Sequence, residues 1–79
     1  MIDNPTIEAL TLISVVSSNL RAAGYDKQQQ IMDIEFLSGR IYRYFGVPQK
    51  IYAQLLTARS KGSWFARNIR GKFKYKRIH

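Results

Sequence analysis

The residues best suited to chemistry are bases and aromatic side chains that alternate close to the C-terminus. Residues 72–77 carry four bases and two aromatic rings, in the order Lys72, Phe73, Lys74, Tyr75, Lys76 and Arg77. In an extended segment the three lysines would line one side and the two rings the other. Phosphate contacts combined with base stacking hold single strands without reading their sequence. The pattern therefore indicates nucleic-acid binding, although packing of Phe73 and Tyr75 on the core would explain the rings equally well.

Further basic residues lie where an anion could be held. A predicted helix begins at Ser60-Lys61-Gly62-Ser63, and free backbone N–H groups favour an anion there. The order of a Walker A loop is missing, and simple N-capping by Ser60 accounts for the same residues. Arg67 and Arg70 would share a face of this helix. The candidate nucleic-acid-binding residues are Arg59, Lys61, Arg67, Arg70, Lys72, Lys74, Tyr75, Lys76 and Arg77.

The residues needed for catalysis or metal binding are scarce. The sequence has no Cys, and its single His is the last residue, His79. Thiolate metal sites are therefore excluded, and His-based catalysis has almost no basis. Asp33 and Glu35 share a strand face, and paired carboxylates can transfer protons. Beside Arg43, however, these two acids are typical of ordinary surface strand residues. We therefore expect no enzyme, no metal and no cofactor.

The charge is distributed unevenly along the chain. Thirteen Lys and Arg face five Asp and Glu, which gives a formal charge of +8 on 79 residues. No acid follows Glu35, so residues 1–35 sum to −3 and residues 36–79 to +11. Bases without counter-charge repel one another and cost stability, which favours an anionic partner over a merely solvated surface. A chain this short forms one small domain, in which we expect no deep substrate cavity.

The elements that must position these residues start with an antiparallel sheet. Residues 1–15 are ambiguous between an N-terminal arm and a short helix that Asn4-Pro5 would start. Residues 16–79 then form a single domain. Its first part is a three-stranded antiparallel β-meander, which buries one face. The expected strands are Leu20–Tyr25, Ile31–Leu37 and Ile41–Phe45.

The loop between the second and third of these strands decides where two tyrosines point, Tyr42 and Tyr44. A two-residue loop, Ser38-Gly39, would place both on the face of the acidic residues. A three-residue loop with a bulge at Gly39 pairs Leu37 with Ile41 and buries both tyrosines. We favour the bulge because the other register would bury Arg43, and burying an unpaired Arg is costly. Arg43 then lies where it can pair across the strands with the acids.

Two helices and a tail complete the predicted fold. Gly46-Val47-Pro48 ends the sheet, and an amphipathic helix follows at Gln49–Thr57. Ser60 caps a second helix, which continues to about Arg70 and is stopped by Gly71. The predicted fold class is thus α+β, with the three-stranded meander followed by two helices packed on one face and a basic extended C-terminal tail.

Three groups of residues resemble a small bacterial family. Its opening is similar to Val16-Ser17-Ser18-Asn19-Leu20-Arg21 and Ala23-Gly24-Tyr25-Asp26. Its centre is similar to Phe36, Ser38-Gly39, Ile41-Tyr42-Arg43-Tyr44 and Gly46-Val47-Pro48, and its last part to Ala58-x-Ser60-Lys61-Gly62, Phe65, Ile69-Arg70 and Tyr75. Over residues 16 to 78 the chain thus resembles the KTSC domain, named for the C-terminus of some lysyl-tRNA synthetases. The family also includes stand-alone small proteins, and its Tyr-x-Tyr motif would correspond to Tyr42 and Tyr44. Attachment to a synthetase implies RNA binding.

Charge and resemblance together predict a non-catalytic nucleic-acid-binding module, with RNA favoured over DNA. The second helix and the tail would hold phosphates, and Tyr75 or Trp64 would stack on bases. The alternative is a protein-interaction module that docks on an acidic partner, such as a synthetase or, for a phage-encoded chain, a host factor. The longest uncharged stretch, Ala9 to Leu20, is too short and too polar to span a membrane. The N-terminus has no basic signal-peptide region, so we expect a cytoplasmic protein. We also expect it to be a monomer.

Overall fold

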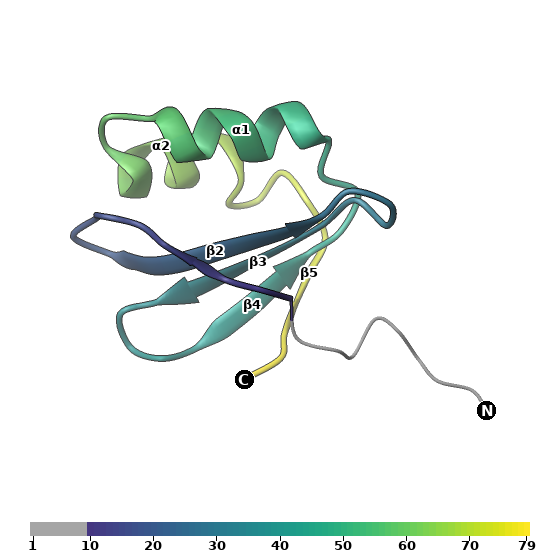
Figure 1. The fold of residues 1–79 in the computed structure, drawn as a ribbon, viewed down its shortest axis with the longest axis horizontal. Helices are drawn as coiled ribbons and strands as arrows, with labels where there is room; N and C mark the ends of the chain where they lie inside the picture. The colour runs from purple at the N-terminus through teal and green to yellow at the C-terminus, as the bar shows by residue number, and fades with distance from the viewer. Residues whose placement is uncertain (1–9) are drawn as a thin grey trace.

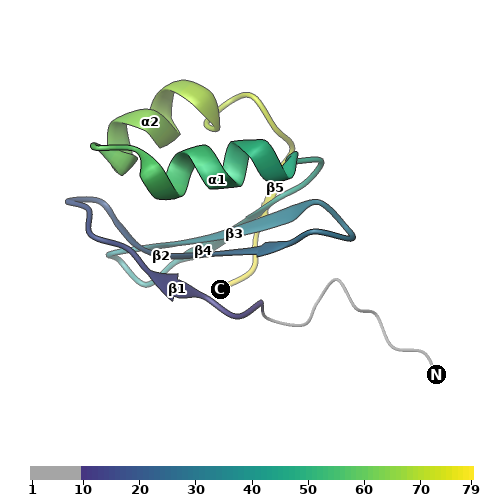
Figure 2. The same cartoon turned by 45° about the horizontal axis from the view of Figure 1, so that its top comes forward.

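One antiparallel sheet carries two helices on one of its faces (Figures 1 and 2). The computed structural model describes residues 10–79 and shows an α+β fold with the strand order β1-β2-β3-β4-β5. The sheet is built from β1 (Ile13–Ser14), β2 (Leu20–Asp26), β3 (Ile31–Phe36), β4 (Ile41–Tyr44) and β5 (Tyr75–Arg77). The helices are α1 (Gln49–Thr57) and α2 (Lys61–Asn68). The chain therefore crosses from the sheet to the helices and returns to the sheet at its end.

The sheet has five strands, so the prediction of a three-stranded meander is wrong. The three predicted strands are its centre, and β1 and β5 extend it on the two sides through the pairs Ile13 with Ala23 and Tyr44 with Tyr75. These outer strands have two and three residues, too few to leave an alternating pattern in the sequence. Of the segment predicted as an arm or short helix, residues 13–14 form β1. The helix that Asn4-Pro5 would start lies outside the described residues.

The loop between β3 and β4 has three residues, as the bulged alternative required, but lies one position earlier. Phe36 N–H donates to the carbonyl of Arg40 at 2.9 Å, and Gly39 adopts a φ of 93°. The predicted pairing of Leu37 with Ile41 is therefore wrong, because Ile41 pairs with Glu35. A shift of two positions keeps every side chain on the same face. The two central tyrosines accordingly point toward the helices, as predicted.

The core lies between the helices and the sheet. Its members are at most 5% exposed and come from both layers: Leu20, Ala23, Met32, Ile34, Tyr44, Val47, Leu55, Phe65 and Ile69. The second helix ends at Asn68, not at about Arg70 as predicted. Gly71 then turns the chain with a φ of 76°, and residues 72–74 lead back to the sheet. Arg70 consequently belongs to the connection between α2 and β5.

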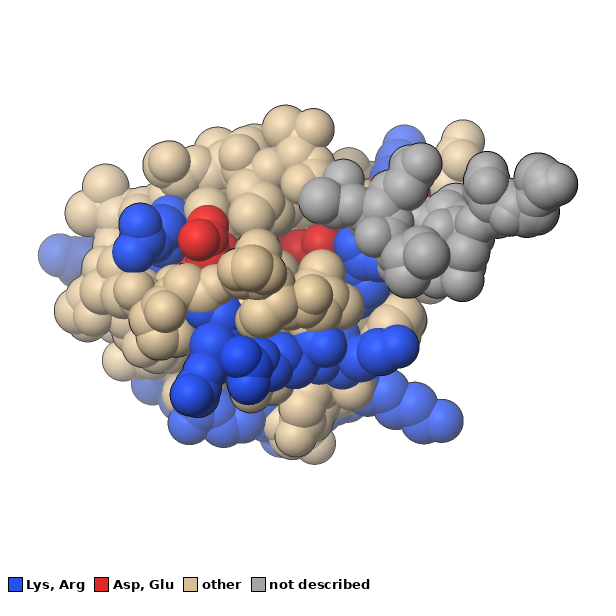
Figure 3. Space-filling model, turned by 90° about the horizontal axis from the view of Figure 1, so that it is seen from below, with Lys and Arg blue, Asp and Glu red and all other residues tan. Residues whose placement is uncertain are grey.

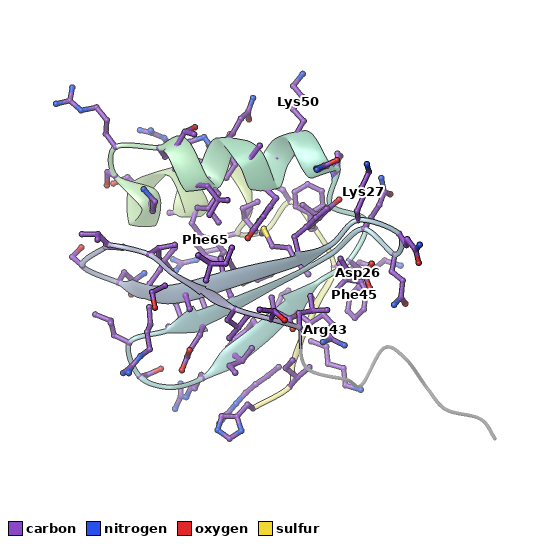
Figure 4. All side chains as sticks on the ribbon, in the orientation of Figure 1. Asp26, Lys27, Arg43, Phe45, Lys50 and Phe65 are labelled. Carbon is purple, nitrogen blue, oxygen red and sulfur yellow. The ribbon has the colours of Figure 1, made fainter. Side chains whose placement is uncertain are left out.

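The opposite face of the sheet is also covered. Asp33 and Arg43 are each 1% exposed, so the prediction that Asp33 is an ordinary surface residue is wrong. The predicted pairing of Arg43 across the strands with an acid is confirmed, because Arg43 lies opposite Asp33. Nε of Arg43 lies 2.8 Å from Oδ1 of Asp33, and Nη2 lies 2.9 Å from Oδ2. Figure 4 shows Arg43 beneath the sheet, away from the helices. The segment before β1 crosses this face so closely that a Cβ on Gly24 would lie 2.5 Å from the carbonyl oxygen of Thr11.

Candidate nucleic-acid interface

An open pocket of about 530 Å³ lies where the β3–β4 hairpin, the end of α2 and β5 meet. Five aromatic side chains line it, namely Phe36, Tyr42, Tyr44, Phe65 and Tyr75. Arg40, Arg70 and Asn19 also line it, and no acidic side chain does. The expectation that so short a chain forms no deep cavity is compatible with this shape, because the pocket opens to solvent along one side.

The sheet register sets the geometry of the tyrosines in this pocket. Tyr42 and Tyr44 are two residues apart on β4 and so point to the same side of the sheet. Pairing of β4 with β5 places Tyr75 directly opposite Tyr44. The ring centroid of Tyr75 lies 5.7 Å from that of Tyr42 and 5.8 Å from that of Tyr44. Tyr75 is 60% exposed, and it is thus the ring that a ligand can reach from outside.

The hydroxyl of Tyr44 is available to a ligand inside the pocket. Burial raises the pKa of Tyr44 to about 12, against the opposing charge of Arg70, so the hydroxyl keeps its proton at neutral pH. Tyr44 is 5% exposed, and within residues 10–79 its hydroxyl has no hydrogen-bond partner. The oxygen is not sealed off, because no fully buried side-chain oxygen or nitrogen of the described chain lacks a partner. It therefore opens into the pocket, where it can donate and accept.

Two guanidinium groups border the pocket without a carboxylate partner. The guanidinium carbon of Arg70 lies 5.8 Å from the ring centroid of Phe65. Among residues 10–79 the ion pairs are Arg21 with Glu35 and Arg43 with Asp33. Arg40 and Arg70 are therefore free to bind an anion. Sequence reasoning missed Arg40, although its even spacing from Tyr42 and Tyr44, two and four residues, was a signal that could have found it.

The rim of the pocket is held by the chain before β2. The carbonyl of Asn19 accepts from the N–H of Leu37 at 3.1 Å, and Arg21 Nη2 donates to the Leu37 carbonyl at 3.0 Å. Asn19 is itself fixed by the Ser17 hydroxyl, which accepts from its N–H at 3.1 Å. The hairpin loop that precedes Arg40 is thus tied down on one side of the pocket.

A second, shallower hollow continues from the pocket along the connection to β5. It is lined by Gly71, Lys72, Phe73, Lys74 and Tyr75, and it shares Gly71 and Tyr75 with the pocket. Phe73 packs against the core, whereas Lys72, Lys74 and Tyr75 are exposed. The two rings of the predicted tail thus have different surroundings, one packed and one open. We call the pocket and this hollow together the β5 groove.

The last two candidate residues lie on opposite sides of β5. Lys76 is opposite Arg43 in the register and so points away from the helices, whereas Arg77 is opposite Tyr42 and shares the side of Tyr75. Nε of Arg77 donates to the carbonyl of His79 at 3.2 Å. Viewed from below, basic side chains form a band across the molecule, with acidic side chains to one side of it (Figure 3). Lys76 therefore adds positive charge to the side of the sheet away from the helices.

Five predicted site residues line neither hollow: Lys76 and Arg77 on β5, and Arg59, Lys61 and Arg67 at or near α2. The ammonium of Lys61 donates to the carbonyl of Ala58 at 2.9 Å, just beyond the end of α1. The Ser60 hydroxyl accepts from the N–H of Ser63 at 3.4 Å, which is the capping arrangement. The prediction that Arg67 and Arg70 share a helix face is wrong, because Arg70 lies beyond the helix. Trp64 is half-buried against the core.

A metal-binding cluster and a membrane-spanning helix are both absent from the part of the chain that the structure describes. Residues 10–79 hold no cluster of three or more His, Cys, Asp or Glu that could bind a metal ion. Neither of their helices has the length and apolar character that a membrane span requires.

Comparisons with known proteins identify relatives of this arrangement. A family model described as the KTSC domain matches residues 16–73. A protein from Stutzerimonas stutzeri is 47% identical over 53 residues, which are 67% of this chain and 75% of that protein. A lysine–tRNA ligase from Nostoc sp. is 39% identical over 70 residues, which are 89% of this chain but 12% of the ligase. The crystal structure of a KTSC domain protein from Yersinia pestis superposes with a TM-score of 0.86 at 34% identity, covering 90% of this chain and 100% of that one.

Proposed function

The chain belongs to the KTSC domain family, and from that premise we propose that it binds RNA through the β5 groove without catalysing a reaction. A single-stranded segment would follow the groove, with phosphates on Arg70, Lys72 and Lys74 and a base stacked on Tyr75. Lys76 and Arg77 would extend the contact along β5. The proposed role is that of a cytoplasmic binding module acting as a monomer, as the sequence suggested.

The observation that carries this proposal is a groove whose cations have no counter-charge and whose outer ring is exposed. No acidic side chain lines either hollow, and Tyr75 is 60% exposed between them. An aromatic side chain exposed to this degree gains little from the core. Stacking on a base would bury it, and neighbouring lysines would neutralise the phosphates on either side. The exposed ring and the unpaired cations of the β5 groove therefore both suit a single-stranded nucleic acid.

A relative supports RNA over DNA. The Nostoc protein that matches 89% of this chain is a lysine–tRNA ligase, an enzyme whose name includes an RNA. A domain attached to such an enzyme has an RNA close at hand. We accordingly take RNA as the favoured nucleic acid.

The test is a titration of a fluorescently labelled single-stranded RNA octamer, followed by anisotropy over a series of salt concentrations. Contacts with about three phosphates give an expected slope of log K against log salt of about −2 for a single strand. A slope near zero, or no binding at low salt, would contradict the proposal. A protein partner that stays bound after nuclease treatment, together with absent RNA binding, would favour the protein-interaction alternative.

Three of the candidate cations provide internal controls. Arg59 and Arg67 are exposed but line neither hollow, and Lys61 is bonded to a backbone carbonyl. The proposed contact does not need them. Replacing Arg59 and Arg67 with Gln lowers the net charge by as much as replacing Lys72 and Lys74 with Gln. Comparing the RNA affinities of the two variants therefore distinguishes the effect of the groove from the effect of net charge.

A further inference from the structure

We infer that the aromatic pocket of the β5 groove is a binding site for one unstacked nucleotide, whose base enters beside Tyr75 and whose phosphate lies between Arg40 and Arg70. This inference deepens the proposed RNA-binding function and rests on it for the source of the nucleotide. It assigns the pocket a ligand class, a planar heterocycle joined to a phosphate, and adds Arg40 and the Tyr44 hydroxyl to the cations and the stacking on Tyr75 that the proposed function uses.

The size and lining of the pocket fit this ligand class. Its volume of about 530 Å³ lies within the range of about 300–1,000 Å³ that is usual for small-molecule sites. Five aromatic rings supply apolar walls, and an unstacked base is bound on such rings in single-strand recognition. Tyr75 is mostly exposed, so a base can slide against its face without displacing a packed side chain.

A hydroxyl that opens into the pocket and makes no hydrogen bond within the described residues suits a ligand with a hydrogen-bonding edge. The Tyr44 hydroxyl is inside the pocket, and within the described residues it makes no hydrogen bond. An apolar side chain in the pocket would leave this hydroxyl unsatisfied, which is unfavourable. The edge of a base carries both donors and acceptors, so it can satisfy a group that donates or accepts. Asn19, also in the lining, adds a side-chain amide.

The two cations define where the charged part of the ligand lies. Arg40 and Arg70 both line the pocket, and neither has an ion-pair partner within residues 10–79. Guanidinium groups bind phosphate oxygens in a bidentate manner. From there the strand would continue past Tyr75 into the hollow of Lys72 and Lys74, which shares that tyrosine with the pocket. The repeated cations match the repeated phosphates of a strand.

The experiment compares two RNA octamers of equal charge, one entirely abasic and one with a single adenine at its centre. Stacking of one base is worth about a 5- to 150-fold gain in affinity. We expect wild-type protein to bind the adenine octamer more tightly by this factor. Tyr75→Ala should bind both octamers alike, with the salt slope of the wild type retained. Tyr44→Phe, which keeps the ring, should lose about 2- to 12-fold for the adenine octamer only.

A matched charge control separates the pocket from the remaining surface. Arg40→Gln should weaken binding of the adenine octamer, whereas Arg59→Gln, which removes an exposed charge outside both hollows, should not change the preference for adenine. A third arm titrates AMP alone, followed by backbone amide shifts. Shifts confined to the pocket in wild type, and absent in Tyr75→Ala, would support the site for a free nucleotide as well.

The outcomes distinguish this inference from the function it rests on. Equal, salt-dependent binding of both octamers by wild type would overturn the nucleotide pocket and the stacking on Tyr75, and would leave intact the binding of RNA through its phosphates. Binding of AMP without binding of either octamer would keep the pocket, assign it a free nucleotide, and contradict RNA binding. The inference would be overturned if neither octamer nor AMP bound to the protein. It would also be overturned if an acidic peptide that contains Phe displaced bound AMP at a lower concentration than the adenine octamer does.

Discussion

Arg40 and Arg43 are three residues apart on the same hairpin, yet the sheet gives them opposite surroundings. Arg43 is 1% exposed and makes two hydrogen bonds to the carboxylate of Asp33 on the neighbouring strand. Arg40 is exposed, lines an aromatic pocket and has no carboxylate partner within residues 10–79. The side chains of Arg40 and Arg43 thus lie on opposite faces of this hairpin. Arg43 is in a buried ion pair, and Arg40 borders an open pocket.

The difference shows how an uneven charge in sequence becomes a surface. Two of the acids in the described chain are used in ion pairs, Asp33 with Arg43 and Glu35 with Arg21. The hydrogen bonds that Arg43 donates to Asp33 raise the pKa of Arg43, so its guanidinium stays charged despite its burial. The third acid of the described chain, Asp26, accepts hydrogen bonds from its neighbours Gln28 and Gln29, and no acid among residues 10–79 forms an ion pair with a cation of the β5 groove. We therefore expect changes on the paired face to alter stability, and changes in the groove to alter binding.

The largest expected effect comes from breaking the buried pair. Asp33→Ala removes the carboxylate to which the buried Arg43 guanidinium donates two hydrogen bonds, and we expect a loss of about 3–5 kcal/mol in the free energy of unfolding. Urea unfolding followed by circular dichroism measures it. The double variant Asp33→Leu, Arg43→Leu should be more stable than Asp33→Ala, because it removes both charges. A loss below about 1 kcal/mol for Asp33→Ala would contradict the structural role of the pair.

A smaller loss is expected where the chain crosses the paired face. A Cβ at position 24 would lie 2.5 Å from the Thr11 carbonyl oxygen and 2.9 Å from Leu12 Cδ2. Gly24→Ala must push that segment away from β2, at a cost of about 1–3 kcal/mol. The measurement is again urea unfolding. Gly39 has open space at its Cβ position but a φ of 93°, so Gly39→Asn is a control that keeps a residue tolerant of this φ. A neutral Gly24→Ala would show that the face is not closely covered.

The helix cap is expected to contribute less again. Ser60→Ala removes the acceptor of the Ser63 N–H, which should cost about 1 kcal/mol of stability. RNA affinity should stay unchanged, because Ser60 lines neither hollow of the β5 groove. The RNA anisotropy titration described for the β5 groove measures the affinity of the Ser60→Ala variant. A large loss of RNA affinity at unchanged stability would contradict this prediction and would indicate a phosphate site at the start of α2.

Much of the central fold could be predicted from local pattern. The alternation in Ile31–Phe36 and the spacing in Gln49–Thr57 identified a strand and a helix that the structure contains. The direction of Tyr42 and Tyr44 followed from the cost of burying an unpaired Arg. The direction of the tyrosines is as predicted, but the assumption that this register leaves Arg43 exposed is wrong. Arg43 is buried on the other face of the sheet, with Asp33 as its partner. Alternation shows which residues share a face and not what covers it.

The parts that could not be predicted depend on contacts between distant segments. The outer strands are stabilised by their neighbours, because two or three residues have too little intrinsic preference to form a strand. The pocket is formed by a hairpin, a helix end and a terminal strand, none of which contains it alone. Arg40 was missed for this reason. The alternation of bases and rings in residues 72–77, by contrast, predicted an extended segment, and Tyr75–Arg77 form β5.

The most direct test of the account is the salt dependence of RNA affinity in two variants of equal charge. Lys72→Gln with Lys74→Gln removes two proposed phosphate contacts, whereas Arg59→Gln with Arg67→Gln removes two exposed cations outside the groove. All four side chains are exposed, so stability should change by no more than about 0.5 kcal/mol. We expect the lysine variant alone to lose about 1.4 from the slope of log K against log salt. Equal losses in both variants would mean that net charge, and not the β5 groove, attracts the RNA.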